Sequence, residues 1–138
     1  MRTKHLPFSV LLSLYKKENP KYLKEALDSI FCQTVRSDDV VLVEDGLLPD
    51  NLEVVVRDYE RQYHELHVVR FEQNRGLGVA LNEGMRYCKH DIIARADTDD
   101  INHPDRFEQE LKVLLEHPEY DLISAWIDEF VDNPKQIH

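Results

Sequence analysis

The chain has 138 residues, and 17 Lys or Arg against 27 Asp or Glu give it a formal net charge of −10 at pH 7. This length is typical of a single domain that buries its own hydrophobic core. Hydrophobic residues make up 42% of the chain and charged residues 32%, which excludes disordered and collagen-like classes. Because nucleic-acid-binding surfaces are usually basic, the acidic balance predicts no nucleic-acid partner.

Targeting signals are not evident in the sequence. No apolar run approaches the roughly 20 residues of a membrane-spanning helix, and the segment Met1–Val10 lacks the features of a signal peptide. Cys32 and Cys88 form no zinc-binding or Cys-x-x-Cys spacing, as is typical of a reduced cytosolic protein. These features together predict a cytoplasmic protein.

Strand-like and helix-like segments alternate along the first part of the chain. The mostly apolar run Phe8–Tyr15 predicts a strand that is covered on both faces. Asn19 and Pro20 then predict the start of a helix, as its N-cap and its first residue. A second buried strand, Val40–Val43, ends at Glu44-Asp45-Gly46. The helix between these strands has the spacing of a core-facing stripe at Leu23, Ala26, Leu27, Ile30 and Phe31.

The same alternation continues through two more strands. A helix is predicted to begin at Pro49-Asp50, and the strand His67–Phe71 follows it. Another helix begins after Asn74-Arg75-Gly76 and leads to the strand Asp91–Ala96. The residues predicted to face inward are Leu52, Val55, Val56, Tyr59 and Tyr63 in the first of these helices, and Leu77, Leu81, Met85 and Cys88 in the second.

The last elements predicted are a helix that begins at Pro104-Asp105 and a fifth strand, Leu122–Trp126. The helix has Phe107, Leu111, Leu114 and Leu115 as its inward residues. Strict alternation with short connections predicts an α/β fold with three layers, α/β/α, around a mostly parallel sheet. We expect one domain over residues 1–138. Such sheets bind their ligands at the carboxyl ends of the strands.

Acidic residues gather at two of the predicted strand ends. Glu44-Asp45 follows the second strand, and Asp97-Thr98-Asp99-Asp100 follows the fourth. Neighbouring carboxylates repel one another unless a cation lies between them, and Mg²⁺ or Mn²⁺ prefers such oxygen ligands. If the chain stays extended, Asp97 and Asp99 point to the same side. The plainer alternative is an Asp-rich turn, since Asp satisfies turn backbone and caps helices. The second acidic strand end favours a metal site.

A set of motifs in a particular order extends over nearly the whole chain. They are Phe8–Tyr15, Leu27–Ile30 with Gln33-Thr34, Val41–Gly46, Asn74–Gly78 with Ala80–Gly84, Ala94–Asp100 and Pro104–Phe107. With these motifs the sequence resembles an inverting family 2 glycosyltransferase of the bacterial exopolysaccharide type, similar to amylovoran biosynthesis glycosyltransferases. The resemblance implies a GT-A fold, of which this chain is the N-terminal, nucleotide-binding part, truncated at its C-terminus.

The resemblance also implies roles for single residues in nucleotide binding. Tyr15 and Glu18 match positions that contact the base and its ribose, and Ser13 lies at the same strand end. Asp45 matches the acidic residue that hydrogen-bonds the base, with Glu44 as the less favoured choice. Arg75 lies in the loop that borders the nucleotide pocket.

The Asp-x-Asp motif of the family falls on Asp97-Thr98-Asp99. The resemblance implies that Asp97 faces the ribose or the donor sugar and that Asp99 binds the metal, Mn²⁺ or Mg²⁺, which holds the diphosphate. Asp100 is an alternative for either role. Arg106 is either a helix-end ion pair or a residue that orients this motif.

The reaction implied is displacement of a nucleoside diphosphate from the anomeric carbon of a sugar by an acceptor hydroxyl. The expected donor is a nucleotide-diphospho-sugar, with a UDP-sugar favoured, and the expected acceptor is a saccharide or a lipid-linked saccharide. The pathways implied are exopolysaccharide, capsule or lipopolysaccharide synthesis. The general base of the family comes from a later segment, so we expect it beyond His138, in a longer protein that lies peripherally at the inner face of the membrane.

Two alternatives remain open at this point. The chain is either part of an active transferase or a catalytically incomplete fragment that binds a nucleotide-sugar without the general base. A receiver-like signalling domain shares the alternating pattern, but it requires an acidic pair after the first strand, where this chain has Ser13 and Tyr15. A missing C-terminal half would also leave a strand edge uncovered, which predicts self-association.

Overall fold

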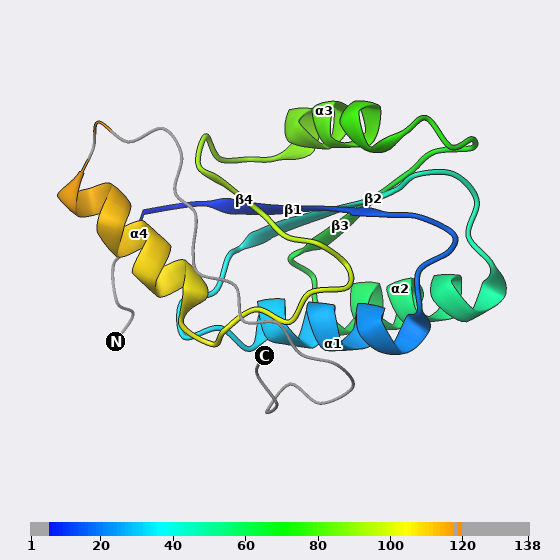
Figure 1. The fold of residues 1–138 in the computed structure, drawn as a ribbon, viewed down its shortest axis with the longest axis horizontal. Helices are drawn as coiled ribbons and strands as arrows, with labels where there is room; N and C mark the ends of the chain where they lie inside the picture. The colour runs from blue at the N-terminus through cyan, green and yellow to red at the C-terminus, as the bar shows by residue number, and fades with distance from the viewer. Residues whose placement is uncertain (1–5, 118, 120–138) are drawn as a thin grey trace, which may run out of the picture.

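A computed structural model of the chain describes residues 6–117 and 119. Its sheet has four parallel strands in the order β3-β2-β1-β4 (Figure 1). The strands are β1 (Ser9–Leu14), β2 (Asp39–Glu44), β3 (Leu66–Arg70) and β4 (Ile93–Arg95). The four strands predicted in this part of the chain are therefore confirmed, whereas the fifth, Leu122–Trp126, lies outside the described residues.

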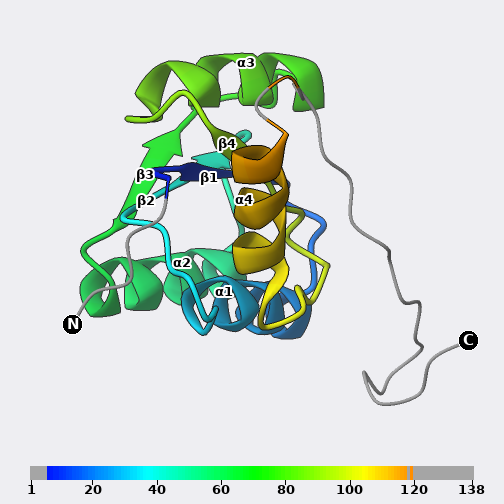
Figure 2. The same cartoon turned by 90° about the vertical axis from the view of Figure 1, so that its left-hand side faces the viewer.

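Helices follow each strand and cover both faces of the sheet. They are α1 (Pro20–Phe31), α2 (Asp50–Gln62), α3 (Leu77–Tyr87) and α4 (Arg106–Glu116). Figure 2 shows α1 and α2 on one face, α3 on the other, and α4 beside the sheet at its β4 side. The predicted three-layer α/β/α architecture is thus confirmed. None of the helices in residues 6–117 is both long and apolar enough to cross a membrane.

The sheet separates two layers of core. Val10, Leu12 and Leu14 of β1 pack in the larger layer, with α1, α2 and α4. Leu11 faces the opposite way and packs with α3, as the two-residue period of a strand requires. The predicted start of α1 is confirmed, since Oδ1 of Asn19 accepts a hydrogen bond from the backbone N–H of Lys21 at 2.8 Å. The outer strands in this part of the chain are β3 and β4, and self-association through an uncovered edge stays a prediction.

The inward face predicted for α3 is wrong at two positions. Leu77 and Met85 are 58% and 51% exposed, and the residues buried against the sheet are Ala80 and Gly84. Leu115 of α4, which was also expected to face inward, is 60% exposed.

The close approach of α3 to the sheet explains the choice of small residues. A Cβ atom at Gly84 would lie 2.5 Å from Cδ1 of Leu11 and 2.8 Å from Cγ2 of Val43. Interiors are close-packed, so no room is left there for a larger side chain. The helix therefore contacts the sheet most closely through Ala80 and Gly84, and Leu81 packs against the same core while partly buried. Its exposed apolar residues are Leu77, Val79, Met85 and Tyr87.

Glu44, the last residue of β2, is a buried carboxylate at the boundary of β2, β3 and α2. Its Oε1 lies 3.4 Å from Nε of Arg70, whereas its Oε2 is buried without a hydrogen-bond partner. Arg70 also forms ion pairs with two glutamates of α2, since its Nη2 lies 3.1 Å from Oε1 of Glu53 and 2.6 Å from Oε1 of Glu60. Burial, followed by the neighbouring Glu53, raises the pKa of Glu44 to about 7, against the opposing charge of Arg70.

Replacing Gly84 with Leu is expected to destabilise the protein by about 1–3 kcal/mol, because the new side chain would force α3 away from the sheet. The matched control is Gly78→Leu on the same helix, where an added Cβ meets nothing within 4 Å. That change should be neutral or stabilise the helix by up to about 1 kcal/mol. Urea unfolding of both variants checks this, and equal stabilities of the two would contradict the packing described.

Replacing Glu44 with Gln is expected to remove a pH-dependent loss of stability. The folded state holds the Glu44 proton more tightly than the unfolded chain, whose glutamate has a pKa of 4.5. The free energy of unfolding therefore falls as the pH rises from 4.5 through about 7. The variant should match the parent near pH 4 and exceed its stability at pH 8 by about 1–3 kcal/mol.

Urea unfolding at the two pH values measures this difference. Glu72→Gln, at an exposed glutamate after β3, is the matched control and should follow the pH profile of the parent. A Glu44→Gln variant whose stability differs from the parent by the same amount at both pH values would refute the assignment.

Candidate functional site

The carboxyl ends of the parallel strands lie along one edge of the sheet, and the structure places the predicted site residues at this edge. They are Arg75 after β3, Asp45 after β2, Ser13, Tyr15 and Glu18 at the end of β1 and after it, and Asp97, Asp99 and Asp100 after β4. We call this edge of the sheet the rim, and the groups follow one another along it in the order of the strands. Ser13 alternates with the buried Leu12 and Leu14, so it lies on the α3 face, and Tyr15 is 42% exposed.

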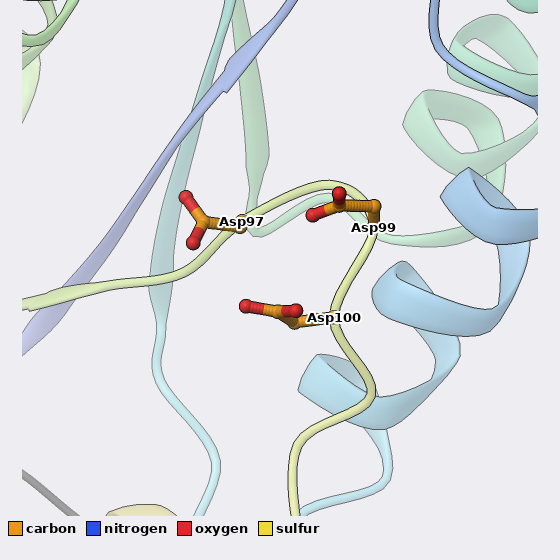
Figure 3. Close-up of side chains that lie close together, drawn as sticks. All are labelled: Asp97, Asp99 and Asp100. Carbon is orange, nitrogen blue, oxygen red and sulfur yellow. The ribbon is translucent and has the colours of Figure 1, made fainter. Parts of the chain in front are cut away.

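Three carboxylates converge in the acidic loop, which we define as residues Asp97–Asp100. One oxygen each of Asp97, Asp99 and Asp100 can be chosen such that all three lie within 4.8 Å of one another, and all three side chains are exposed. Figure 3 shows that the three side chains leave the loop toward the same side. Partial burial and the charges of Asp97 and Asp99 raise the pKa of Asp100 to about 6, and Arg106 opposes this rise. Asp97 and Asp99 therefore lie on the same side of the chain, as predicted, and Asp100 joins them.

A side-chain hydrogen bond joins the acidic loop to the loop after β1. The hydroxyl of Thr98 donates to Oε2 of Glu18 at 2.7 Å, and Oε1 of Glu18 accepts from the backbone N–H of Asn19 at 3.0 Å. Thr98 is buried, so it points under the loop while its two aspartate neighbours point outward. Residues 97–100 form a turn, in which the backbone N–H of Asp100 donates to the carbonyl of Asp97 at 3.3 Å. The extended geometry predicted for Asp97 and Asp99 is therefore wrong, and the Asp-rich turn is the conformation found.

Asp45 joins the end of β2 to the loop after β3. Its Oδ1 accepts from the backbone N–H of Arg75 at 2.7 Å, and its Oδ2 accepts from the N–H of Gly76 at 3.1 Å. The side-chain amide of Asn74 donates to Oδ2 at 3.3 Å. Asp45 is only 4% exposed. Its carboxylate thus fixes the Asn74–Gly76 loop, and Oδ1, which accepts one of these bonds, has a second lone pair for a further donor.

Arg75 and Glu44 lie on different sides of this strand end. The guanidinium of Arg75 stacks over the ring of Phe71, with 4.8 Å between Cζ and the ring centroid. The side chain of Arg75 is therefore positioned beside the Asn74–Gly76 loop. Glu44 instead faces Arg70 and α2, so Asp45 is the acidic residue of the pair that faces the Asn74–Gly76 loop.

Sequence reasoning missed two polar residues, Ser29 of α1 and Gln33 just after this helix, that hold the segment after the acidic loop. Oγ of Ser29 accepts from both the backbone N–H and the side-chain amide of Asn102, at 3.0 and 3.1 Å. The side chain of Gln33 donates to the carbonyl of His103 at 2.6 Å and accepts from the N–H of Phe107 at 3.1 Å. The available signal was that both residues belong to the motif of Leu27–Ile30 with Gln33-Thr34.

Known proteins with similar sequences include bacterial glycosyltransferases. The chain is 42% identical over 127 residues to a UDP-Gal:alpha-D-GlcNAc-diphosphoundecaprenol beta-1,3-galactosyltransferase of Escherichia coli, and covers 46% of that protein. It is 43% identical over 129 residues to the amylovoran biosynthesis glycosyltransferase AmsE of Erwinia amylovora, of which it covers 48%. These alignments include 92% and 94% of this chain, so the chain spans about half the length of these curated relatives.

Solved structures of glycosyltransferases share the fold. The S. aureus TarS fragment 1-349 in complex with UDP matches with a TM-score of 0.71 and 26% identity, over 82% of this chain and 33% of that one. The mannosyltransferase PcManGT of Pyrobaculum calidifontis, in complex with GDP-Man and Mn²⁺, matches with a TM-score of 0.66 and 25% identity, over 80% of this chain and 32% of that one. The fold is therefore that of GT-A glycosyltransferases, as the resemblance implied.

A family assignment follows from the extent of the sequence match. Residues 9–138 match the Glycosyl transferase family 2 domain. This match includes all four strand ends that form the rim, and it decides against a receiver-like domain. The chain belongs to glycosyl transferase family 2.

Proposed function

We propose that this chain is the donor-binding part of a metal-dependent, inverting glycosyltransferase that transfers a sugar from a nucleoside diphosphate to an acceptor hydroxyl. The observation that carries the proposal is the acidic loop, whose three carboxylates approach within 4.8 Å at the end of β4. Family membership supplies the reaction class. The GDP-Man and Mn²⁺ bound to PcManGT support the donor class and the cofactor.

The donor atoms of the acidic loop fit a hard divalent cation. Mg²⁺ and Mn²⁺ take carboxylate oxygens and commonly connect one or two of them to substrate phosphates. Asp99 is the proposed ligand, with Asp97 or Asp100 as its partner. When bound, the metal would offset negative charge on the departing diphosphate.

The other end of the rim is proposed to hold the nucleoside. Asp45 and Arg75 follow strands β2 and β3, and β2 is separated from β4 by β1 alone. Two strand spacings, about 10 Å, then separate the base end from the acidic loop. Tyr15, Glu18 and Ser13 lie between them at the end of β1, where a ribose would sit. Asp97 is exposed at the end of β4, the strand next to β1.

A UDP-sugar is the favoured donor, because the TarS fragment binds UDP and UDP-GlcNAc and the E. coli relative is named for UDP-Gal. A saccharide or lipid-linked saccharide is the proposed acceptor, since the name of that relative includes a diphosphoundecaprenol-linked sugar. An acceptor of this kind places the enzyme at the cytoplasmic face of the membrane. We assign the general base to none of the described rim residues, so this chain is proposed to bind donor and the longer protein to carry out transfer.

Calorimetric titration with UDP tests the proposal directly. We expect UDP to bind in the presence of Mn²⁺, and Asp99→Asn to weaken this binding about 10- to 100-fold, as loss of a metal ligand does. Asp91→Asn is the matched control, since Asp91 is exposed at the opposite end of the β4 segment. UDP affinity that is equal with and without Mn²⁺ would contradict the metal role. Failure to bind any nucleotide of a panel that includes GDP would contradict donor binding.

Asp45→Asn is expected to weaken the hydrogen bonds that hold the Asn74–Gly76 loop, at the end of the rim proposed to bind the base. One of the two backbone N–H groups of Arg75 and Gly76 would lose its acceptor, so stability should fall by about 1–3 kcal/mol and UDP binding should weaken. Binding of Mn²⁺ alone should be unchanged, because the acidic loop lies two strands away. Asp58→Asn, in an exposed ion pair with Arg61, is the control. Unchanged melting temperature and UDP affinity in Asp45→Asn would rule out both roles.

A further inference from the structure

Arg106, the first residue of α4, connects the two ends of the acidic loop. Its Nη2 donates to the carbonyl oxygen of Arg95, just before the loop, at 2.7 Å. Its Nη1 donates to Oδ1 of Asn102, just after the loop, at 2.6 Å. Its Nε donates to Oε1 of Glu110, one turn further along α4, at 2.6 Å. The side chain is 21% exposed, and its bonds to Asn102 and Glu110 are partly buried.

The sequence left two roles open for Arg106, a helix-end ion pair and a residue that orients the Asp-x-Asp motif. The hydrogen-bond partners of Arg106 distinguish between them. A helix-end ion pair needs only the bond to Glu110, whereas the bonds to Arg95 and Asn102 serve the chain that precedes α4. Asn102 is itself held from α1 by Ser29, at 3.0 and 3.1 Å. The bridge therefore connects β4 to a residue that is already fixed in place.

The chemistry of the guanidinium suits this bridge. Arginine presents its donors in a rigid planar fork, so one side chain can satisfy three acceptors in fixed directions. Lysine carries the same charge on a flexible stem and cannot reproduce this geometry. The three carboxylates of the acidic loop repel one another, so without such a bridge the loop would open to increase their separation.

We propose that Arg106 is a positioning residue for the acidic loop. By bridging Arg95 and Asn102 it sets the chain path on which the carboxylates of Asp97, Asp99 and Asp100 converge before any cation binds. The consequence for cation affinity rests on the metal site proposed above. The effect of Arg106 on the loop itself is independent of that site.

Binding of Mn²⁺ to the protein without nucleotide tests the inference, with free Mn²⁺ measured by electron paramagnetic resonance well below the unfolding temperature. Arg106→Gln and Arg106→Lys are both expected to weaken Mn²⁺ binding about 10- to 100-fold. A purely electrostatic role predicts the opposite sign for Arg106→Gln, because removing a positive charge near the carboxylates would tighten cation binding. Unchanged or tighter binding in Arg106→Gln therefore overturns the proposal.

Two control variants separate positioning from charge and from stability. Arg86→Gln on α3 removes the same charge from an exposed pair with Glu83 and should change Mn²⁺ affinity by less than about twofold. Glu110→Gln alters the helix-end pair but leaves the bonds to Arg95 and Asn102, so it should also stay within about twofold. A Glu110→Gln variant that loses as much Mn²⁺ affinity as Arg106→Gln would reduce Arg106 to a structural ion pair.

A second measurement distinguishes failure of this inference from failure of the metal site. If the parent binds no Mn²⁺, the metal assignment fails, and amide hydrogen exchange over residues 96–102 then decides the role of Arg106. Faster exchange in Arg106→Gln than in Arg86→Gln supports the positioning of the loop. Equal exchange in the two variants overturns it.

Discussion

The parallel pairing of β1 with its two neighbours is the constraint on which the rest of the molecule depends. β1 pairs with β2 over six residue pairs and with β4 over three, all in the same direction. Because the strands are parallel, the loops that follow them leave the sheet at one edge, and residues far apart in the chain meet there. Gly46 completes this arrangement at β2. Its φ of 99° and a Cβ position only 2.8 Å from the backbone nitrogen of Asn74 allow the chain to turn directly against the next loop.

Local sequence patterns were sufficient for the elements and their order. The start of α1 was predictable because Asn19 and Pro20 act within one turn of the helix that they begin. The buried face of α3 was not predictable. The spacing of its apolar residues indicates one inward stripe, but the short distance to the sheet buries Ala80 and Gly84 instead. The small residue at position 84 is explained by the side chains of Leu11 and Val43, which lie against it. Hydrophobic periodicity within residues 77–88 gives no information about those two residues of the sheet.

The residue types of the site were predictable, whereas the bonds that hold them in place were not. Asp97 and Asp99 could be assigned to one side because both belong to one short segment, although a turn and not an extended strand brings them together. The bond between Thr98 and Glu18 joins positions 80 residues apart, and that between Ser29 and Asn102 joins positions 73 residues apart. Each of these side chains is an ordinary polar residue in its own segment. Its role becomes visible only when the sheet brings the two segments together.

Two acidic clusters in this chain limit their repulsion in opposite ways. At the end of β2, Arg70 directs its guanidinium at the carboxylates of Glu44, Glu53 and Glu60, and the pKa of the buried Glu44 rises to about 7. At the end of β4, the described bonds of Arg106 go to a main-chain carbonyl, an asparagine and a glutamate of its own helix. The carboxylates of the acidic loop thus stay exposed while its backbone is held, with Nη2 of Arg95 at 3.8 Å from Oδ1 of Asp97 as an exposed ion pair. An arginine that pairs with carboxylates competes with a cation for their oxygens, whereas one that holds the backbone leaves those oxygens available, so the second arrangement is the one that suits an incoming cation.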